Sequence, residues 1–332
     1  MLPAYTTWGH QDRKSGLCYA GAMEINTVAI IGTGAVGCLY GSKLVGCLGH
    51  QHVQAIASGE RLQRYRSEGL YFNEKRVDFD FTDSPAVADL VIIATKNLQL
   101  AQAVQAIKPA VGPKTSILSL LNGTESEGVV AQAYGEEKVL YSFAVGLSSM
   151  HQGNHIHADS EGKIVFGEKD NSVTERVKAI QRLFDKAHIG WEVPKNIHLE
   201  LWKKFMLNTA FNTLSAITWS GYGDFVHPEI QQLVRMTSNE VIAVANAEGI
   251  PLTSAMVEDN IATIVRLNKD GMTSMFQDMV AGRKTENDWF CGTVVKLGEK
   301  HHIPTPTCQV LSLLVKSCEA SRARAIAEHI QR

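Results

Sequence analysis

Three polar residues recur at every fourth position of a mostly apolar segment, residues 201–212 (LWKKFMLNTAFN): Lys204, Asn208 and Asn212. Side chains four residues apart lie on one stripe of a helix. Because unpaired polar groups are costly in apolar surroundings, a ligand or a network must satisfy this stripe. A desolvated lysine has a lowered pKa and can protonate the oxygen of a carbonyl that receives hydride, while amides beside it bind substrate oxygens. A purely structural hydrogen-bond network to a neighbouring domain is the alternative.

A carrier for the hydride is indicated by residues 28–37 (VAIIGTGAVG), where a buried-strand pattern runs into the motif G-x-G-x-x-G. The first glycine makes a tight turn, the second lets the backbone approach a pyrophosphate, and the third allows close packing of helix on strand. The free N–H groups at the start of the following helix then face the phosphates. The motif therefore predicts a bound nicotinamide dinucleotide. The expected contacts are Gly32, Thr33, Gly34, Ala35, Val36 and Gly37.

The end of the second strand distinguishes NAD from NADP. An acidic residue there would bind the ribose 2′-hydroxyl, but this strand ends at Ser58, and Glu60 lies two residues farther on. Ser58 can donate to a 2′-phosphate, and Arg61 or Arg64 can pair with it. We therefore expect NADP, with Ser58 and Arg61 at the 2′-phosphate.

Two further polar residues follow predicted parallel strands. Lys96 comes directly after residues 89–95, and Asn122 directly after residues 115–121. Open α/β sheets place their ligands at the carboxyl ends of strands, so we expect Lys96 and Asn122 to contact the ligands. A lysine at such an edge could also be only a solvated charge.

Residues 273–278 (TSMFQD) have the pattern of a helix start, with Ser274 and Gln277 in capping-box register. Glu286 follows twelve residues after Ser274, which in one straight helix would separate them by about 18 Å. That is too far for both to share a small-molecule site. Gly282 and Arg283 supply a break, so we predict two helices here.

The elements that position these residues alternate between strand and helix through the first part of the chain. Expected strands cover residues 27–31, 52–57, 89–95, 115–121 and 139–144, and expected helices end near Leu48 and cover 60–68, 98–107 and 125–134. Residues 145–167 alternate apolar and polar side chains, which indicates antiparallel strands added to the sheet edge. This order is typical of a doubly wound α/β sheet of the Rossmann type.

After about Pro194 the pattern becomes entirely helical. Helices are expected over residues 198–218, 228–248 and 254–267 and through the remaining third. We therefore predict an all-helical C-terminal domain over residues 196–332, after a dinucleotide-binding domain over residues 23–195. Residues 1–22 are aperiodic and lack the apolar centre of a signal peptide, so we treat them as an N-terminal extension.

Composition limits the class of protein. A chain of 332 residues with 45% hydrophobic and 20% charged residues is typical of a soluble globular protein of two domains. The formal net charge of −2, without a dense basic block, argues against nucleic acid as a partner. No apolar run reaches about 18 residues, which argues against a membrane span. Six scattered cysteines without a CxxC pair indicate buried thiols of a cytoplasmic protein.

The histidines raise the question of a metal site. His151, His155 and His157 cluster in a segment that contains glycine and asparagine, and His301 precedes His302. The first three have no carboxylate partner at metal-site spacing, so we expect surface histidines and no metal.

Taken together, these segments resemble the ketopantoate reductase (2-dehydropantoate 2-reductase) family from residue 23 to the carboxyl end. The matching pieces are GTGAVG, ATK (94–96), LNG (121–123), LWKKFMLN (201–208), TSMFQD and GRKTE (282–286). The resemblance implies a Rossmann domain followed by a helical domain, with the active site in the cleft between them. It also implies NADPH-dependent reduction of 2-dehydropantoate to pantoate for coenzyme A synthesis.

Carried over by position, the resemblance implies that Lys204 is the general acid and Glu286 its hydrogen-bond partner. Lys96 and Asn122 would contact the reacting centre and the cofactor. The residues lining the substrate pocket would be Asn208, Asn212 and Ser274, with Ser274 on the substrate carboxylate.

Three positions depart from the family pattern. Gly271 and Tyr222 stand where better-known members carry asparagines, and Ser58 stands where an arginine usually meets the 2′-phosphate. A different small 2-keto acid is therefore a possible substrate. The alternative functions are an enzyme like the β-hydroxyacid dehydrogenases or imine reductases, and a non-catalytic NADP sensor. The sequence leaves the oligomeric state open, with a homodimer possible.

Overall fold

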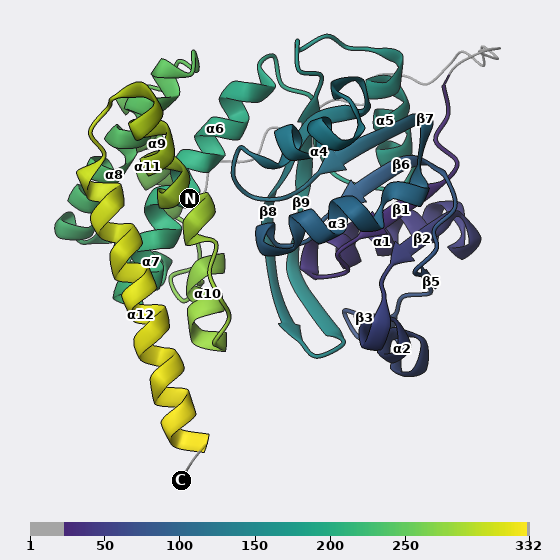
Figure 1. Cartoon of the computed structure of the whole chain (residues 1–332), viewed down its shortest axis with the longest axis horizontal. Helices are drawn as coiled ribbons and strands as arrows, with labels where there is room; N and C mark the ends of the chain where they lie inside the picture. Colours follow the sequence, from purple (N-terminus) through teal and green to yellow (C-terminus); the bar gives the residue numbers. More distant parts are fainter. Residues whose placement is uncertain (1–22, 331–332) are drawn as a thin grey trace, which may run out of the picture.

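The structure is a computed structural model that describes residues 23–330, and for residues 148–152, 159 and 323–330 it describes the backbone alone. The expected N-terminal extension (residues 1–22) and the side chain of His151 lie outside the described residues. The chain forms a sheet with helices on both faces, followed by a set of helices at one side of it (Figure 1).

The sheet contains ten strands, and its main path has the order β4-β3-β9-β8-β7-β6-β1-β2-β5. Strands β5, β2, β1, β6, β7 and β8 are parallel, whereas β8 and β9 are antiparallel. The strands are β1 (Val28–Ile31), β2 (Val53–Ile56), β3 (Tyr71–Phe72), β4 (Lys75–Arg76), β5 (Asp80–Thr82), β6 (Ala88–Ile93), β7 (Val111–Ser119), β8 (Val139–Gln152), β9 (His155–Gly167) and β10 (Trp191–Glu192).

Alternation of side chains along the central strand explains why helices cover both faces. In β1, Val28 and Ile30 enter one apolar cluster, and Ala29 and Ile31 enter another, as the two-residue period of a strand requires. The helices of this part are α1 (Ala35–Leu48), α2 (Gly59–Glu68), α3 (Leu100–Ala106), α4 (Ser126–Tyr134) and α5 (Glu175–Lys186). The predicted doubly wound sheet is confirmed.

The antiparallel hairpin of the structure begins before residue 145, which is the start expected from the sequence. β8 begins at Val139 and pairs with β9 along most of its length, but β9 is not the edge, because it also pairs with β3 and β10. The short strands β3, β4, β5 and β10 were not predicted. They have two or three residues each, too few for an alternating pattern to show.

The part after Asn196 contains only helices among the described residues, as predicted. They are α6 (Ile197–Leu207), α7 (Thr213–Thr218), α8 (Pro228–Ala247), α9 (Ser254–Ile264), α10 (Ser274–Ala281), α11 (Cys291–His301) and α12 (Pro306–Ile330). They enclose an apolar cluster of their own. Short 3₁₀ turns cover His50–His52, Asn97–Gln99, Lys108–Ala110, Glu136–Lys138, Tyr222–Val226 and Asn287–Trp289. Within the described residues, no helix is long and apolar enough to cross a membrane.

One predicted helix has an unexpected internal structure, and one predicted break is present. The single helix expected over residues 198–218 contains a π-helical segment, Asn208–Asn212, between α6 and α7. Such segments insert one residue into a helix and are frequent at functional sites. The break expected after α10 is present: Gly282 adopts a left-handed conformation (φ 76°) and ends that helix.

Candidate active site

The glycine turn between β1 and α1 has the shape that a pyrophosphate requires. Gly32 has φ +93°, and a Cβ atom there would lie 2.5 Å from the Thr95 backbone nitrogen. A Cβ at Gly37 would lie 2.1 Å from the Gly32 carbonyl oxygen, whereas a Cβ at Gly34 would meet open space. The turn therefore packs closely on the sheet at two glycines and leaves the third free for close approach of a ligand. These residues fit a dinucleotide, held by the N–H groups at the start of α1.

The loops after β6 and β7 lie beside this turn, because β1, β6 and β7 are neighbouring parallel strands. The first loop presents Lys96 and the second presents Asn122, as the sequence predicts. Asn97 follows Lys96 and is buried, and its side-chain amide donates to the Asn122 carbonyl (2.8 Å). The two loops are therefore joined to each other.

The stripe of the helical domain faces the same loops. Lys204 Nζ donates to Asn122 Oδ1 (3.0 Å) and lies 5.3 Å from the centre of the Phe143 ring. Asn208 Nδ2 lies 3.5 Å from the same Asn122 oxygen. Asn212, at the far end of the π-helical segment, donates to Ser274 Oγ (3.2 Å). The structure therefore brings all three residues of the stripe to one side of the helix.

Glu286 enters the site from the loop after α10. Its Oε1 accepts from the Asn97 side chain (2.9 Å) and backbone N–H (3.3 Å), and its Oε2 accepts from Asn122 Nδ2 (3.0 Å). Among the described contacts Lys204 makes no direct hydrogen bond or ion pair with Glu286, so the expected direct partnership is wrong for this structure. The physical reason is that the Asn122 amide stands between the two charges and bonds to both.

Lys96 is held by the helical domain as well. Its ammonium pairs with Asp278 Oδ2 on α10 (2.9 Å), and it lies 3.9 Å from Glu286 Oε2. Asp278 is 2% exposed, and its other oxygen accepts from Arg283 (2.8 Å). Two carboxylates of the helical domain thus bind the loop after β6 and hold it against that domain.

The start of α10 differs from the expected capping box. The N-cap is Thr273, whose hydroxyl accepts from the Phe276 N–H (3.2 Å), and Ser274 is the first residue inside the helix. Gln277 instead donates to the Met272 carbonyl (3.4 Å). The prediction was wrong by one residue because Thr273 also has a capping side chain. The Ser274 hydroxyl is consequently available to accept from Asn212.

The electrostatic surroundings of Lys204 favour proton transfer near neutral pH. The side chain is partly buried, and desolvation lowers its pKa to about 8, against the opposing attraction of Glu286 and Glu127. An ammonium with such a pKa can release its proton to an alkoxide far more readily than an exposed lysine.

Ser58 and Arg61, the residues expected at a 2′-phosphate, lie at the start of α2. Ser58 is the N-cap of α2, it is exposed, and its hydroxyl caps no N–H of that helix. Arg61 is exposed on the first turn of α2, whereas the Arg64 guanidinium lies over the Tyr65 ring, 5.7 Å from its centre.

Two of the three positions expected to depart from the family pattern, Gly271 and Tyr222, are in contact with each other. A Cβ atom at Gly271 would lie 2.6 Å from Cδ2 of the Tyr222 ring, and the Tyr222 N–H donates to the Gly271 carbonyl (2.9 Å). The ring therefore occupies the space that a side chain at position 271 would need.

Three residues of this neighbourhood were missed from the sequence: Asn97, Asp278 and Glu127. Asn97 had a usable signal, since it follows Lys96 at the end of a strand. Asp278 and Glu127 had none, because a carboxylate in a helical pattern is usually solvated, whereas these are 2% and 1% exposed.

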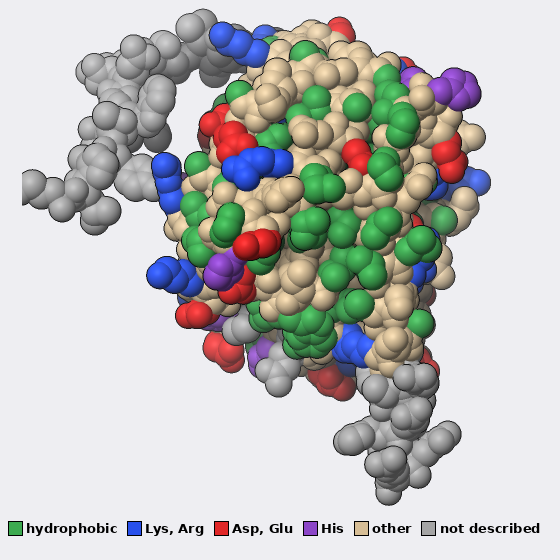
Figure 2. Space-filling view, turned by 90° about the vertical axis from the view of Figure 1, so that its left-hand side faces the viewer, with side chains coloured by type: hydrophobic (Ala, Val, Ile, Leu, Met, Phe, Trp, Pro, Cys, Tyr) green, Lys and Arg blue, Asp and Glu red, His purple; other side chains and the backbone are tan. Residues whose placement is uncertain are grey.

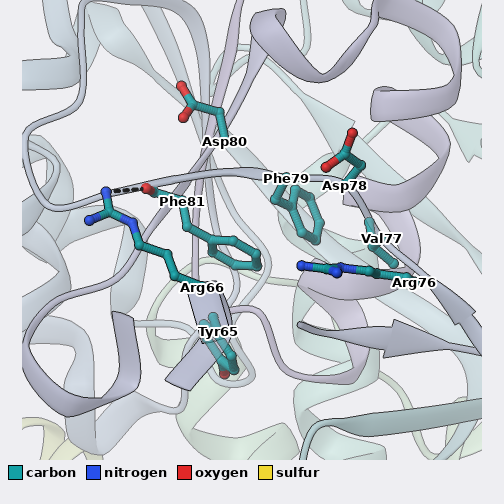
Figure 3. A pocket seen from close by; sticks show the side chains of 8 residues that line it. All are labelled: Tyr65, Arg66, Arg76, Val77, Asp78, Phe79, Asp80 and Phe81. Atoms are coloured by element: carbon teal, nitrogen blue, oxygen red, sulfur yellow. Dashed lines mark hydrogen bonds between the residues drawn. The ribbon is translucent and has the colours of Figure 1, made fainter. Parts of the chain in front are cut away.

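A cavity of about 290 Å³ (Figure 3) lies elsewhere, between the end of α2 and β5. Its lining includes Arg66, which donates to the Phe81 carbonyl (2.8 Å), and Arg76, Asp78 and Asp80. It shares no residue with the cluster around Lys204, so we do not assign the reaction to it.

The histidines have other contacts. His155 stacks on Tyr71 with ring centres 4.6 Å apart, and His301 Nε2 contacts the Glu248 carboxylate. No group of three or more His, Cys, Asp or Glu side chains among the described residues is arranged to hold a metal ion.

Comparison with known proteins identifies a family that this chain matches. The family described as ketopantoate reductase PanE/ApbA matches residues 28–171, and its C-terminal domain matches residues 196–319. A 2-dehydropantoate 2-reductase of Streptococcus pyogenes is 28% identical over 302 residues, covering 88% of this chain and 98% of that protein.

Two solved structures are also similar. A PanE/ApbA family ketopantoate reductase from Ralstonia eutropha is 29% identical, with a TM-score of 0.78 over 90% of this chain and 99% of that one. A D-mandelate dehydrogenase with NADH and anilino(oxo)acetate has a TM-score of 0.81 over 89% and 99% of the two chains. At 24% identity, this second likeness shows the fold alone.

Proposed function

The chain belongs to the ketopantoate reductase family, and from this membership we propose that it reduces 2-dehydropantoate to pantoate, or a related small 2-keto acid, with NADPH. The observation that supports the proposal best is the meeting of Lys204, Asn122 and Glu286 beside the glycine turn. The membership makes the chain an oxidoreductase, and it favours the ketopantoate reductases over the β-hydroxyacid dehydrogenase or imine reductase group.

NADPH, when bound, supplies the hydride. Lys204 is the general acid, and its ammonium protonates the ketone oxygen as negative charge develops there. Asn122 fixes the position of that ammonium and is itself fixed by Glu286 and Asn97. Asn208, Asn212 and Ser274 hold the substrate, with the Ser274 hydroxyl donating to its carboxylate.

The proposed cofactor contacts follow the glycine turn and the start of α2. The turn binds the pyrophosphate, Lys96 and Asn122 border the nicotinamide end, and Ser58 and Arg61 bind the 2′-phosphate. The absence of an acidic residue at position 58 supports NADP, and the exposed hydroxyl of Ser58 can donate to a phosphate oxygen. The division into domains at residues 195 and 196 belongs to the same proposal, since Asn196 caps α6.

The substrate pocket leaves more than one 2-keto acid open. Tyr222 presents a partly buried aromatic ring at a position where polar contacts are expected in better-known members, and Gly271 adds no side chain. The preferred substrate could accordingly have an apolar group where 2-dehydropantoate has its hydroxyl. This possibility determines the choice of compounds in the assay.

The test is NADPH oxidation by the purified protein with a panel of small 2-keto acids that includes 2-dehydropantoate and members with apolar side chains. Turnover with 2-dehydropantoate supports the full proposal. Turnover only with others would overturn the substrate but not the reaction class. If no member is reduced, the enzymatic proposal fails and the alternative of a non-catalytic NADP sensor gains support.

We also propose that the working form is a homodimer and that its location is cytoplasmic. Apolar side chains gather on the face of the helical domain turned away from the sheet (Figure 2). On α12, Val310, Leu313 and Leu314 are 56%, 67% and 42% exposed and lie on one stripe, which is unusual for a surface without a partner. Sedimentation of the wild type and of Leu313→Glu tests this: a dimer that Leu313→Glu converts to monomer is expected, and a monomeric wild type would contradict it.

A further inference from the structure

Glu127 is a buried carboxyl group to which the proposed reaction assigns no task. It lies in the first turn of α4 and is 1% exposed. Its Oε2 accepts from the Ser126 hydroxyl (3.0 Å), which in turn accepts from the Ser119 hydroxyl (2.8 Å). Its Oε1 lies 3.4 Å from the Ser142 backbone N–H. Burying the charged form of this group costs free energy, because these few hydrogen bonds replace the water that would solvate the carboxylate.

The position of Glu127 links Lys204 to a second cavity. Ser142, whose N–H it accepts from, is followed in β8 by Phe143, and Lys204 lies over the Phe143 ring. On its other side Glu127 lines a cavity of about 260 Å³ together with Gln132, Glu136, Tyr141 and Lys169. Glu136 and Lys169 are exposed, so this cavity is open to solvent.

Lys204 needs such a connection if the proposed function holds. Each reduction leaves it as a neutral amine, while the hydrogen bond described for its side chain is to the amide oxygen of Asn122, which cannot supply a proton. Glu286 also faces it, but both oxygens of that carboxylate accept N–H groups from Asn97 and Asn122. Cofactor and substrate in the cleft would cover the remaining exposure of the lysine.

We propose, as an extension of the function proposed above, that Glu127 returns a proton to Lys204 after each reduction and draws it from solvent in the second cavity. In each cycle the Lys204 ammonium gives one proton to the alkoxide. The Glu127 carboxylic acid gives one to the resulting amine, and the carboxylate then takes one from hydronium or a buffer acid. No electrons move in these steps, and one solvent proton is consumed for each ketone reduced.

The acidities of the two groups agree with this direction. Desolvation raises the pKa of Glu127 to about 7, against the smaller opposing effects of its hydrogen bonds and of Lys204. The pKa of Lys204 is lowered by desolvation to about 8, so transfer from the acid to the amine is favourable. Proton exchange of this kind proceeds at hydrogen-bond distance or through water. The cavity that Glu127 lines has room for the water from which it draws its proton.

The first test needs no substrate. Lys204 is acylated with acetic anhydride over a range of pH, and the modified peptide is quantified by mass spectrometry in wild type, Glu127→Gln and Glu136→Gln. Glu136 borders the same cavity but is exposed and paired with Lys169, so its variant is the matched control. We expect Glu127→Gln to lower the midpoint pH of Lys204 acylation by about one unit. We expect Glu136→Gln to leave that midpoint unchanged. An equal midpoint in Glu127→Gln and wild type would overturn the coupling.

The second test separates the first turnover from the later ones, at about pH 6.5 in stopped flow. We expect Glu127→Gln to retain the first hydride transfer within about twofold and to lose about 10-fold or more in steady-state turnover, with partial recovery in Glu127→Asp. Equal losses in both phases would contradict a proton-supplying role. If wild type reduces no keto acid, the proposed function fails, while the acylation midpoints still decide whether Glu127 is coupled to Lys204.

Discussion

Lys204 reaches Glu286 only through Asn122, which accepts from the ammonium with one atom of its amide (3.0 Å) and donates to the carboxylate with the other (3.0 Å). An amide is suited to this place because it has a donor and an acceptor at opposite ends. The positions of the proton donor and of its carboxylate are therefore set by one side chain of the sheet domain.

Asn122→Ala removes both bonds and leaves the Glu286 carboxylate with fewer donors. We expect kcat of reduction to fall by about 10- to 100-fold, because each misplaced charge-assisted hydrogen bond is worth about 1.5–3 kcal/mol. Steady-state assays measure this, with the exposed Asn246→Ala as the control. Wild-type kcat in Asn122→Ala would show that the bridge has no part in the reaction.

Cofactor preference follows from the start of α2. We expect Ser58→Ala and Arg61→Ala each to lower the ratio of kcat/KM for NADPH to that for NADH by about 10-fold, since a charge-assisted contact contributes on the order of 1.4 kcal/mol or more. Arg64→Ala is the matched control, because Arg64 lies over the Tyr65 ring. An unchanged ratio in both variants would remove these residues from the 2′-phosphate site.

The rate of the first hydride transfer should depend on pH through Lys204. The general acid must be protonated, and its pKa is lowered to about 8 by burial. Single-turnover rates are therefore expected to be constant below about pH 7 and to fall about tenfold per unit above pH 8 or so. Lys204→Arg, whose guanidinium stays charged, should be slower but lack this decline. A wild-type rate that rises with pH would contradict proton donation by Lys204.

The contact of Gly271 with Tyr222 predicts a stability effect. Gly271→Ala places a Cβ atom 2.6 Å from the ring, so we expect it to lower the free energy of unfolding by about 1–3 kcal/mol. The loss should be smaller when Tyr222→Ala is already present. Urea denaturation of the double-mutant cycle measures the coupling, and additive losses would show that the ring is not the obstacle.

Local patterns predicted a large part of this molecule. The glycine turn, the parallel strands that end before Lys96 and Asn122, and the helix that carries Lys204 and Asn208 all follow from short-range periodicity and turn chemistry. The break at Gly282 was predictable for the same reason, because a glycine can adopt the left-handed conformation that ends a helix.

The parts that failed depend on contacts between distant segments. The π-helical segment at Asn208–Asn212 has no signature in residue spacing, and the cap at Thr273 competes with an equally suitable neighbour. The burial of Asp278 and Glu127 depends on Lys96 and on β8, which lie far away in the chain. No pattern within α10 or α4 records these partners.

The most direct test of the account is a single-turnover experiment with NADPH deuterated at the transferable C4 position and the keto acid that the panel identifies. We predict one deuterium at C2 of the 2-hydroxy acid formed by wild type, and a rate lowered by about 10²-fold or more in Lys204→Ala with NADPH affinity little changed. Deuterium-free product, or a Lys204→Ala variant as fast as wild type, would contradict hydride transfer assisted by Lys204.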